Sequence, residues 1–575
     1  MKRLIVYFHY DPLGQIDTAC RVAVEAMAHY GEVFFISNGT LRPADRAWAA
    51  SVTLTCRERE NKGLDVGAYK EALAVIGRGR LARYDELVLM NFTLAGPVCS
   101  LASMFAAMEA RPELAFWGLT RHYAMKSRRF GGRSGEVPEH LQSHFLAVRA
   151  PLLHSEDFWQ YWQKMPLPKS YEESIANHET RFTAHFANLG CRWDSYVDTK
   201  DLRDVFVNPI MACPRELLAN RGCPFFKRRS FFTPYADELR RTDGQAAAEL
   251  YDYLKSETDY PVDDLLRALL PVQPLAAMAQ NLHWHYILPQ TAGECAPILL
   301  DANTLAKGCA LQPDAVYCLP LPRAAGVEGY YYARSMPTNL QLAQAAELFD
   351  AHPLVGVLGP ALPLYAGCAA EKARRWQQQK PAVQAKLSAL DCPLPLDETP
   401  PPLPNGGCLL VRGAAFPQGL PPLQTESDFW LVPLLAQYNG YASATFETAA
   451  QCAARADVLD AALAAQRGVG LGHGLHLRVG GHGPLLPPPV PAPAHDLAPP
   501  DDDAAHRHLP GGGGFFGQGQ GLAHIRFVVL SHGRCLPVVV RFCHCTEFFT
   551  GWQGEAGGGR PLPFVPAPRA CRAAR

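Results

Sequence analysis

The feature that most constrains the fold is a regular alternation of short apolar runs and helix-like segments in the first 110 residues. Four runs predict buried strands, because each is short and bounded by polar residues: residues 4–7, 33–36, 52–55 and 86–90. Segments 17–29, 69–76 and 101–110 carry apolar residues at helical spacing. This alternation predicts an α/β fold with a mostly parallel, Rossmann-type sheet.

The rest of the chain predicts a second α/β domain and a tail. Three further candidate strands, residues 282–288, 315–319 and 354–358, follow a pattern that begins near Leu265. Beyond about Gly468 the chain is rich in Gly, Pro, Ala, His and Arg, a composition that buries too little apolar surface to fold. The 575 residues therefore divide into a first domain (1–240), a second α/β domain (265–455) and a low-complexity, disordered tail (468–575).

Charge and cysteine content narrow the classes of function. Lys and Arg number 54 against 55 Asp and Glu, a net charge of -1, so no basic excess is available for binding nucleic acid. The 17 cysteines form no CxxC pair and no regular spacing, which argues against a disulfide framework. The first residues lack the apolar stretch of a signal peptide, and no run approaches the roughly 20 apolar residues of a spanning helix. We expect a reduced, cytoplasmic protein.

Five segments carry a family resemblance. They are NKGLDVGAYKEAL (61–73), YDELVLMNFTLAGP (84–97), FWGLT (116–120), HLQSHFLAVR (140–149) and the basic stretch 208–232 with CPRELLANRGCPFFKRRSFF. In order and spacing they resemble the rhamnan synthesis protein F family, and weaker likeness extends the resemblance over about residues 1–450. The resemblance implies a GT-A-like nucleotide-sugar glycosyltransferase in the first domain. It also allows the second domain to be glycosyltransferase-like.

The resemblance further implies a reaction and its partners. The implied enzyme is a bacterial hexosyltransferase that moves a deoxyhexose, rhamnose, from a nucleotide sugar such as dTDP-rhamnose. The implied acceptor is a growing cell-wall or O-antigen polysaccharide, lipid-linked, which places the protein in the cytoplasm or peripherally at the inner face of the membrane. A sugar-nucleotide modifier on the same sheet is another class, but no dinucleotide fingerprint supports it.

The donor site is expected where loops leave the carboxyl ends of the strands. There, glycines permit close backbone approach, Asp65 meets ribose or sugar hydroxyls, and Lys62 or Lys70 meets phosphate. The alternative is a tight turn with a helix cap at Asp65. We assign the following residues to donor binding: Asp11, Asn61, Lys62, Gly63, Gly67, Tyr69, Lys70, Asn91 and Thr93.

A divalent cation, Mg or Mn, is the expected cofactor of a metal-dependent transferase of this class, held by an acidic pair after a strand such as 86–90. Members of the family tend to carry an aspartate directly after the asparagine, whereas Phe92 follows Asn91 here. Phenylalanine cannot ligate a metal. Three interpretations stay open: the metal is dispensable, another carboxylate replaces the missing one, or this chain is a non-catalytic glycan- or nucleotide-binding assembly module.

Catalytic and acceptor-side residues are assigned from two later segments. Glu179, in a predicted helix over residues 171–189, is the preferred general base, with Asp65 in reserve and direct displacement with inversion as the mechanism. The alternative for Glu179 is a solvated helix residue. The acceptor side is assigned to Trp117, His140, Gln142 and Ser143, for which structural roles are the alternative.

A basic cluster in residues 221–229 is predicted to meet a diphosphate or anionic lipid headgroups, or else to be a solvated loop. Every one of these assignments depends on one expectation. The side chains of Asn61, Asp65 and Asn91 must face a single cavity, because a sugar diphosphate has to contact the tips of several strands together.

Overall fold

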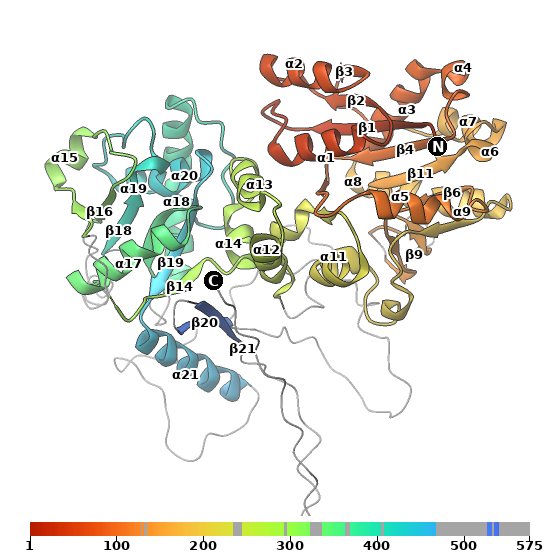
Figure 1. The fold of residues 1–575 in the computed structure, drawn as a ribbon. Helices are drawn as coiled ribbons and strands as arrows, with labels where there is room; N and C mark the ends of the chain where they lie inside the picture. The colour runs from red at the N-terminus through yellow and green to blue at the C-terminus, as the bar shows by residue number, and fades with distance from the viewer. Residues whose placement is uncertain are drawn as a thin grey trace, which may run out of the picture.

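The computed structural model describes residues 1–127, 129–131, 135–233, 244–291, 296–322, 336–362, 368–403, 407–466, 526–531 and 534–539. Two β-sheets, each covered by helices, occupy the two halves of the molecule (Figure 1). The predicted sequence of two α/β units is therefore confirmed, while the exact domain boundaries stay predictions.

The first sheet has seven strands in the order β12-β6-β11-β4-β1-β2-β3. Neighbours pair in parallel except β11, which is antiparallel to both β4 and β6. The predicted mostly parallel, Rossmann-type sheet is confirmed. The strands are β1 (Arg3–Tyr10), β2 (Glu32–Asn38), β3 (Thr55–Arg59), β4 (Glu86–Asn91), β6 (Phe116–Gly118), β11 (Phe145–Arg149) and β12 (Trp193–Ser195).

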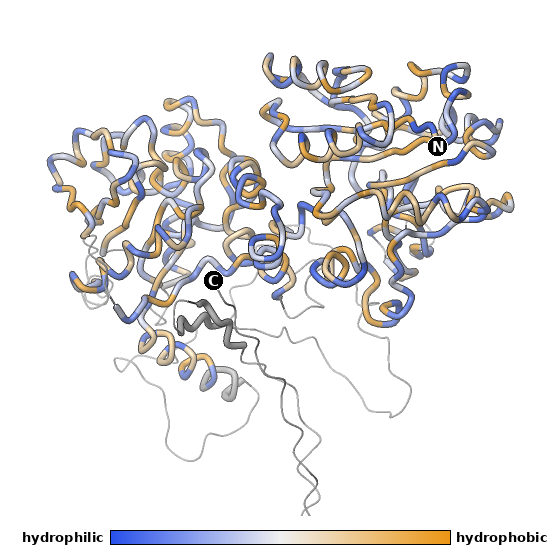
Figure 2. The backbone as a smooth tube through the Cα atoms, viewed as in Figure 1, coloured by the Kyte–Doolittle hydropathy of each residue, from blue (hydrophilic) through white to orange (hydrophobic). Residues whose placement is uncertain are grey.

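Both faces of this sheet are buried, as expected for parallel strands between helices. Along β1, Ile5 and Tyr7 join one apolar cluster, while Leu4 and Val6 join the cluster on the opposite face. Figure 2 shows hydrophobic segments along the central strands. The main helices of this half are α1 (Thr18–Ala28), α2 (Pro43–Val52), α3 (Leu64–Ile76), α5 (Ala102–Glu109), α7 (Glu156–Lys164), α9 (Thr180–Asn188) and α11 (Pro214–Arg221).

One predicted strand differs from the structure. The strand expected at residues 52–55 is wrong: α2 ends at Val52 and β3 begins at Thr55. The observed strand β3 carries no apolar run, so hydrophobicity did not reveal it. Its Arg57 and Arg59 side chains instead donate to the Glu71 carboxylate of α3.

The helix expected over residues 171–189 is confirmed, with one irregularity that was not predicted. It runs through α8 (Tyr171–Ser174), a π-helical turn η2 (Ile175–Glu179) and α9 without a break. π-Helical turns inside helices are frequent at functional sites. This one ends at Glu179.

The second sheet has six strands in the order β14-β19-β17-β18-β16-β15, with β18 antiparallel to its neighbours. Its strands are β14 (His285–Ile287), β15 (Ile298–Leu299), β16 (Val316–Pro320), β17 (Val355–Pro360), β18 (Cys408–Arg412) and β19 (Ala442–Glu447). The helices of this half include α15 (Ala302–Lys307), α17 (Asn339–Ala351), α18 (Cys368–Ala389), α20 (Leu431–Tyr438) and α21 (Ala449–Gln466).

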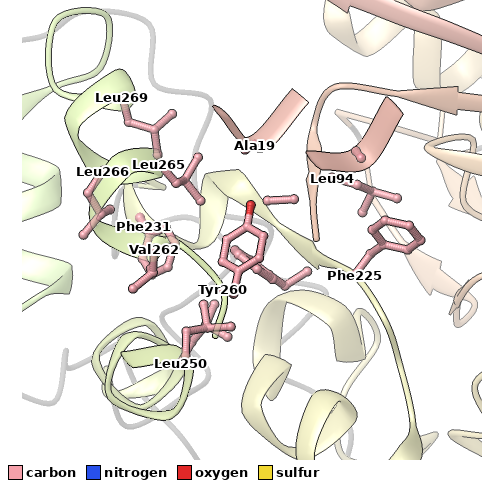
Figure 3. Packing of buried hydrophobic residues seen from close by; sticks show 14 of the residues in the cluster. Ala19, Leu94, Phe225, Phe231, Leu250, Tyr260, Val262, Leu265, Leu266 and Leu269 are labelled. Carbon is pink, nitrogen blue, oxygen red and sulfur yellow. The ribbon is translucent and has the colours of Figure 1, made fainter. Parts of the chain in front are cut away.

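Three helices connect the two sheets: α12 (Ala246–Glu257), α13 (Val262–Leu269) and α14 (Leu275–Asn281). Figure 3 shows Leu265, Leu266 and Tyr260 from this region facing Ala19 and Leu94 of the first half. These residues belong to one buried apolar cluster that continues to the second sheet. The halves therefore share a core.

The end of the chain adds little that is described. Most of the tail, residues 468–575, lies outside the described residues, so its predicted disorder is untested. Within it, β20 (Arg526–Ser531) pairs antiparallel with β21 (Arg534–Val539). No helix in the described part of the chain is both long and apolar enough to cross a membrane.

Candidate functional site

A cavity of about 310 Å³ opens at the carboxyl ends of β1 and β4. Asn61, Asp65 and Asn91 all line it, so the expectation on which the other assignments depend is confirmed. The other polar and charged residues around the cavity are Tyr10, Thr93, His122, His140, Gln142, Ser143, His144, Tyr171, Ser174, Glu179, Asn208, Lys227 and Arg229.

The turn before α3 places Asp65 in the cavity wall. Gly63 caps the helix in the left-handed conformation (φ 72°). A Cβ on Gly67 would lie 2.3 Å from the Lys62 carbonyl oxygen, so this glycine permits the turn to pack on itself. Asn61 is held from β2, because Asn38 Nδ2 donates to its Oδ1 over 3.0 Å. The two glycines therefore shape the loop, and neither lines the cavity.

Asp65 is partly buried and ties three elements together. Its Oδ2 accepts from Asn91 Nδ2 at 3.2 Å, and its Oδ1 accepts from Ser174 Oγ at 3.2 Å and from the Val66 backbone amide. Burial raises the pKa of Asp65, and the nearby charge of Glu179 raises it further. Asp65 is therefore a stronger base than an exposed aspartate.

Glu179 occupies the wall where the acceptor-side residues were predicted. Its Oε2 accepts from the Ser143 backbone amide at 3.1 Å and from Ser143 Oγ at 2.5 Å, and its Oε1 lies 3.6 Å from His140 Nε2. Burial by itself raises the pKa of Glu179, but His140, Ser143 and Lys227 together stabilise the carboxylate, so its pKa lies well below the usual range. Glu179 is ionised at neutral pH.

Two cations of the predicted basic cluster reach this cavity. Lys227 lies in β13 (Phe226–Lys227), which pairs with β5 (Leu94–Ala95), and its Nζ donates to Thr93 Oγ1 over 3.1 Å. Arg229 donates to the Tyr171 hydroxyl over 2.7 Å. The other arginines serve the scaffold, because Arg228 pairs with buried Asp17 and Arg221 pairs with Asp201 and Glu216.

Several predicted donor residues do not line the cavity. Lys62 pairs with Glu60 at the surface, and Lys70 donates to the carbonyl oxygens of Gln163 and Met165. Neither residue lines the cavity, so their predicted contact with a phosphate stays a prediction. The sequence pattern did not show that Lys62 and Lys70 have partners outside the cavity.

Three further assignments concern residues with internal roles. Tyr69 is buried, with its ring against Phe8. Asp11 closes a turn, because its Oδ1 accepts from the amides of Leu13 and Gln15. The acceptor-side prediction for Trp117 is wrong. Its indole is fully buried and donates to Glu86 Oε2 over 2.8 Å, as part of a core network.

The donor set of the cavity does not suit a protein-bound divalent cation. Phe92 packs its ring against Phe8, His9 and Tyr10 and offers no ligand. Among the residues that the structure describes, no group of three or more His, Cys, Asp or Glu side chains is arranged to hold a metal ion. Lys227 and Arg229 supply positive charge in the same cavity.

Sequence reasoning missed several lining residues. Buried His144 contacts Thr120 Oγ1 through Nε2 at 3.3 Å, and burial holds its pKa well below the usual value. Gln142 accepts from the same hydroxyl at 2.9 Å and donates to Asn208 Oδ1 at 3.3 Å. The HLQSH and NP motifs were noticed, but only folding brings them together. Tyr171 and Ser174 had no signal beyond their helical context.

Comparison with known proteins agrees with the family resemblance over much of the first half. Residues 33–302 match the family model described as rhamnan synthesis protein F. A curated relative from Sinorhizobium fredii, described as an uncharacterized protein, is 23% identical over 204 residues, which are 35% of this chain and 49% of the relative. The chain thus spans about half the length of the curated relative it matches.

Solved structures that match part of the chain include two glycosyltransferases. One is mouse xyloside xylosyltransferase 1 in its apo form (11% identity, 32% of this chain, 82% of that chain, TM-score 0.20). Another is a mannosyltransferase from Pyrobaculum calidifontis in complex with GDP-Man and Mn²⁺ (13% identity, 48% of this chain, 77% of that chain, TM-score 0.22).

Proposed function

Because residues 33–302 match the rhamnan synthesis protein F family model, we propose that this chain is a glycosyltransferase that moves a deoxyhexose, rhamnose, from a nucleotide donor to a growing surface polysaccharide. The observation that carries the proposal is the cavity at the carboxyl ends of β1 and β4. It combines two carboxylates with two cations, as transfer from a sugar diphosphate requires.

The donor binds on the side of β4 and β13. Lys227 and Arg229 neutralise the diphosphate, with Thr93 orienting the lysine through its 3.1 Å hydrogen bond. Asp65 and Asn91 are hydrogen-bonded to each other. Asp65 accepts hydrogen bonds from sugar hydroxyls, and Asn91 donates to them. Fixed cations of this kind stabilise the negative charge that accumulates on the leaving group. The preferred donor is dTDP-rhamnose.

The acceptor binds beside His140, Gln142 and Ser143, and Glu179 is the base. The acceptor hydroxyl oxygen forms a bond to the anomeric carbon while the bond from that carbon to the diphosphate oxygen breaks. The hydroxyl proton passes to the carboxylate, and the nucleoside diphosphate leaves with the electron pair. Glu179 faces the acceptor-side residues, and reach comes before pKa in choosing a base. Asp65, whose pKa is raised, is the reserve base.

One observation favours a second function. Phe92 stands where a metal-binding carboxylate is expected, so the chain is alternatively a glycan- or nucleotide-binding assembly module that kept the fold. Calorimetry with nucleotide sugars, run beside a turnover assay with and without Mg²⁺ or Mn²⁺, separates the two functions. Binding without turnover under every condition supports the module.

The direct test of the enzyme is product analysis after incubation with a panel of nucleotide sugars and a polyprenyl-linked glycan acceptor. We expect transfer from dTDP-rhamnose, with the sugar appearing on the acceptor in the inverted anomeric configuration. Transfer of a different sugar supports the proposed glycosyltransferase activity and contradicts the proposed donor. An acceptor of this kind places the protein on the cytoplasmic side of the membrane, in peripheral contact with it.

A further inference from the structure

A second cavity, of about 420 Å³, lies in the other half of the molecule. It sits at the carboxyl ends of β17 and β19, where Pro360 and Thr445 line it, beside β14 (Figure 1). Ligands of open α/β sheets bind at this edge, and the volume is within the usual range for small-molecule sites. Nothing in the first cavity's chemistry depends on these residues.

A buried lysine faces this second cavity. Lys372, near the start of α18, is only 7% exposed and lines the cavity. Within the described ranges its ammonium group has no hydrogen-bonded or ion-paired partner, and burial lowers the pKa of Lys372 to about 7. An uncompensated buried ammonium group is costly unless an anion accompanies it.

The neighbouring charges are already matched. Glu447, at the end of β19, accepts from His285 Nε2 at 2.9 Å and from Arg455 Nε at 2.9 Å. His285 is further held by Thr445 Oγ1 at 2.8 Å, and Arg455 also donates to the Leu362 carbonyl oxygen. Since this carboxylate is shared by two basic groups, it does not serve as counter-ion to Lys372. Arg455 and, when protonated, Lys372 are cations that line the cavity.

The rest of the wall is apolar. Alanines of α14, prolines of residues 400–402, and the side chains of Leu362 and Leu403 complete the lining. A free phosphate ion is small for this space, whereas an ester with an organic group can contact both the cationic and the apolar parts of the wall. We propose that this cavity binds a phosphate or diphosphate ester, with its anionic end at Lys372 and Arg455 and its organic group against the apolar wall.

The experiment is a calorimetric count of inorganic pyrophosphate sites on the full chain. Lys372→Met is compared with Lys380→Met, a matched control on the same helix, where the lysine pairs with Glu398 outside the cavity. We expect Lys372→Met to remove one binding site, or to weaken it at least tenfold, and Lys380→Met to leave it unchanged. An unchanged count and affinity in Lys372→Met overturn the proposal.

The first cavity also offers cations, so Lys227→Met is titrated in parallel. If both sites bind, the wild-type count of two falls to one in each variant. If only the second cavity binds pyrophosphate, the wild type has one site, which Lys372→Met loses and Lys227→Met keeps. That result contradicts the donor-site proposal and not the proposal for the second cavity. A number of binding sites that depends on Lys227 and not on Lys372 contradicts the proposal for the second cavity and agrees with the donor-site proposal for the first.

A measurement on the wild-type chain covers the case in which Lys372→Met does not fold. Acetic anhydride labelling, read by peptide mass spectrometry, should modify Lys372, and pyrophosphate should protect it at least several-fold. Equal labelling with and without pyrophosphate contradicts the proposal. Titrations with dTDP and with geranyl diphosphate then identify the source of the ester. Tighter binding of dTDP indicates a soluble nucleotide, and tighter binding of geranyl diphosphate indicates a lipid phosphate.

Discussion

Asn91 Nδ2 donates to Asp65 Oδ2 over 3.2 Å and thereby joins the end of β4 to the first turn of α3. The same aspartate accepts from Ser174 of α8. A single carboxylate thus sets the relative position of three elements around the cavity. Its replacement should disturb ligand binding before it disturbs the fold.

Asp65→Asn is expected to lower kcat/KM for the nucleotide sugar by about 10- to 100-fold, because charge-assisted hydrogen bonds contribute about 1.5–3 kcal/mol each. Steady-state kinetics with the donor varied measures the change. Asp157→Asn, at an exposed position of α7, is the control and should match the wild type. Wild-type kinetics in Asp65→Asn remove this residue from the donor site.

The pH dependence of kcat/KM should report Asp65. Burial and the charge of Glu179 raise its pKa in the folded protein, whereas the pKa of Glu179 is lowered. As pH falls, Asp65 therefore takes up a proton first, and activity should decline at a pH above the ordinary aspartate range. The profile of Asp65→Asn should lose this acidic limb. An acidic limb that persists unchanged in the variant points to another group.

Glu179→Gln is expected to lower kcat by about 10²- to 10⁴-fold with little change in donor KM, since general base catalysis contributes rate rather than ground-state binding. Initial rates at saturating donor test it. Ser143→Ala, which removes one hydrogen bond that orients the same carboxylate, should cause a smaller loss. If Glu179→Gln retains full kcat, the base lies elsewhere and Asp65 becomes the first choice.

Lys227→Met is expected to weaken nucleoside diphosphate binding by about 10- to 100-fold, as loss of a charged hydrogen bond predicts. Isothermal titration with dTDP measures it. Arg221→Met belongs to the same basic segment but pairs with Asp201 and Glu216, so it should bind as the wild type does. Equal losses in both variants contradict a direct contact by Lys227.

Arg228→Met is expected to cost about 3–5 kcal/mol of unfolding free energy, because it strands the buried carboxylate of Asp17. Urea denaturation followed by circular dichroism measures the loss. The double variant Asp17→Asn with Arg228→Met should recover part of it. A single variant as stable as the wild type means that this ion pair does not stabilise the fold.

Much of the fold was predictable, because local periodicity determines it. The buried strands β1, β2 and β4 are runs of apolar residues, and α1 and α5 show apolar stripes, so the positions of these elements were found within a few residues, whereas α2 was not predicted. The polar strand β3 was misplaced, since Arg57 and Arg59 find their partner in Glu71, which is distant in sequence. The π-helical turn before Glu179 has no periodic signature either.

The sequence by itself determined the α/β class, the two successive units and several of the loops that line the cavity, because hydrophobic period and loop composition are local properties. Tertiary structure alone decided which side chains share the cavity. Lys62, Lys70 and Trp117 carry suitable chemistry but point elsewhere, while Lys227 and Arg229 arrive from more than 130 positions beyond Asn91. The direction and burial of a side chain depend on contacts between distant segments. One edge of a sheet brings together residues whose spacing in the sequence does not reveal that they are neighbours.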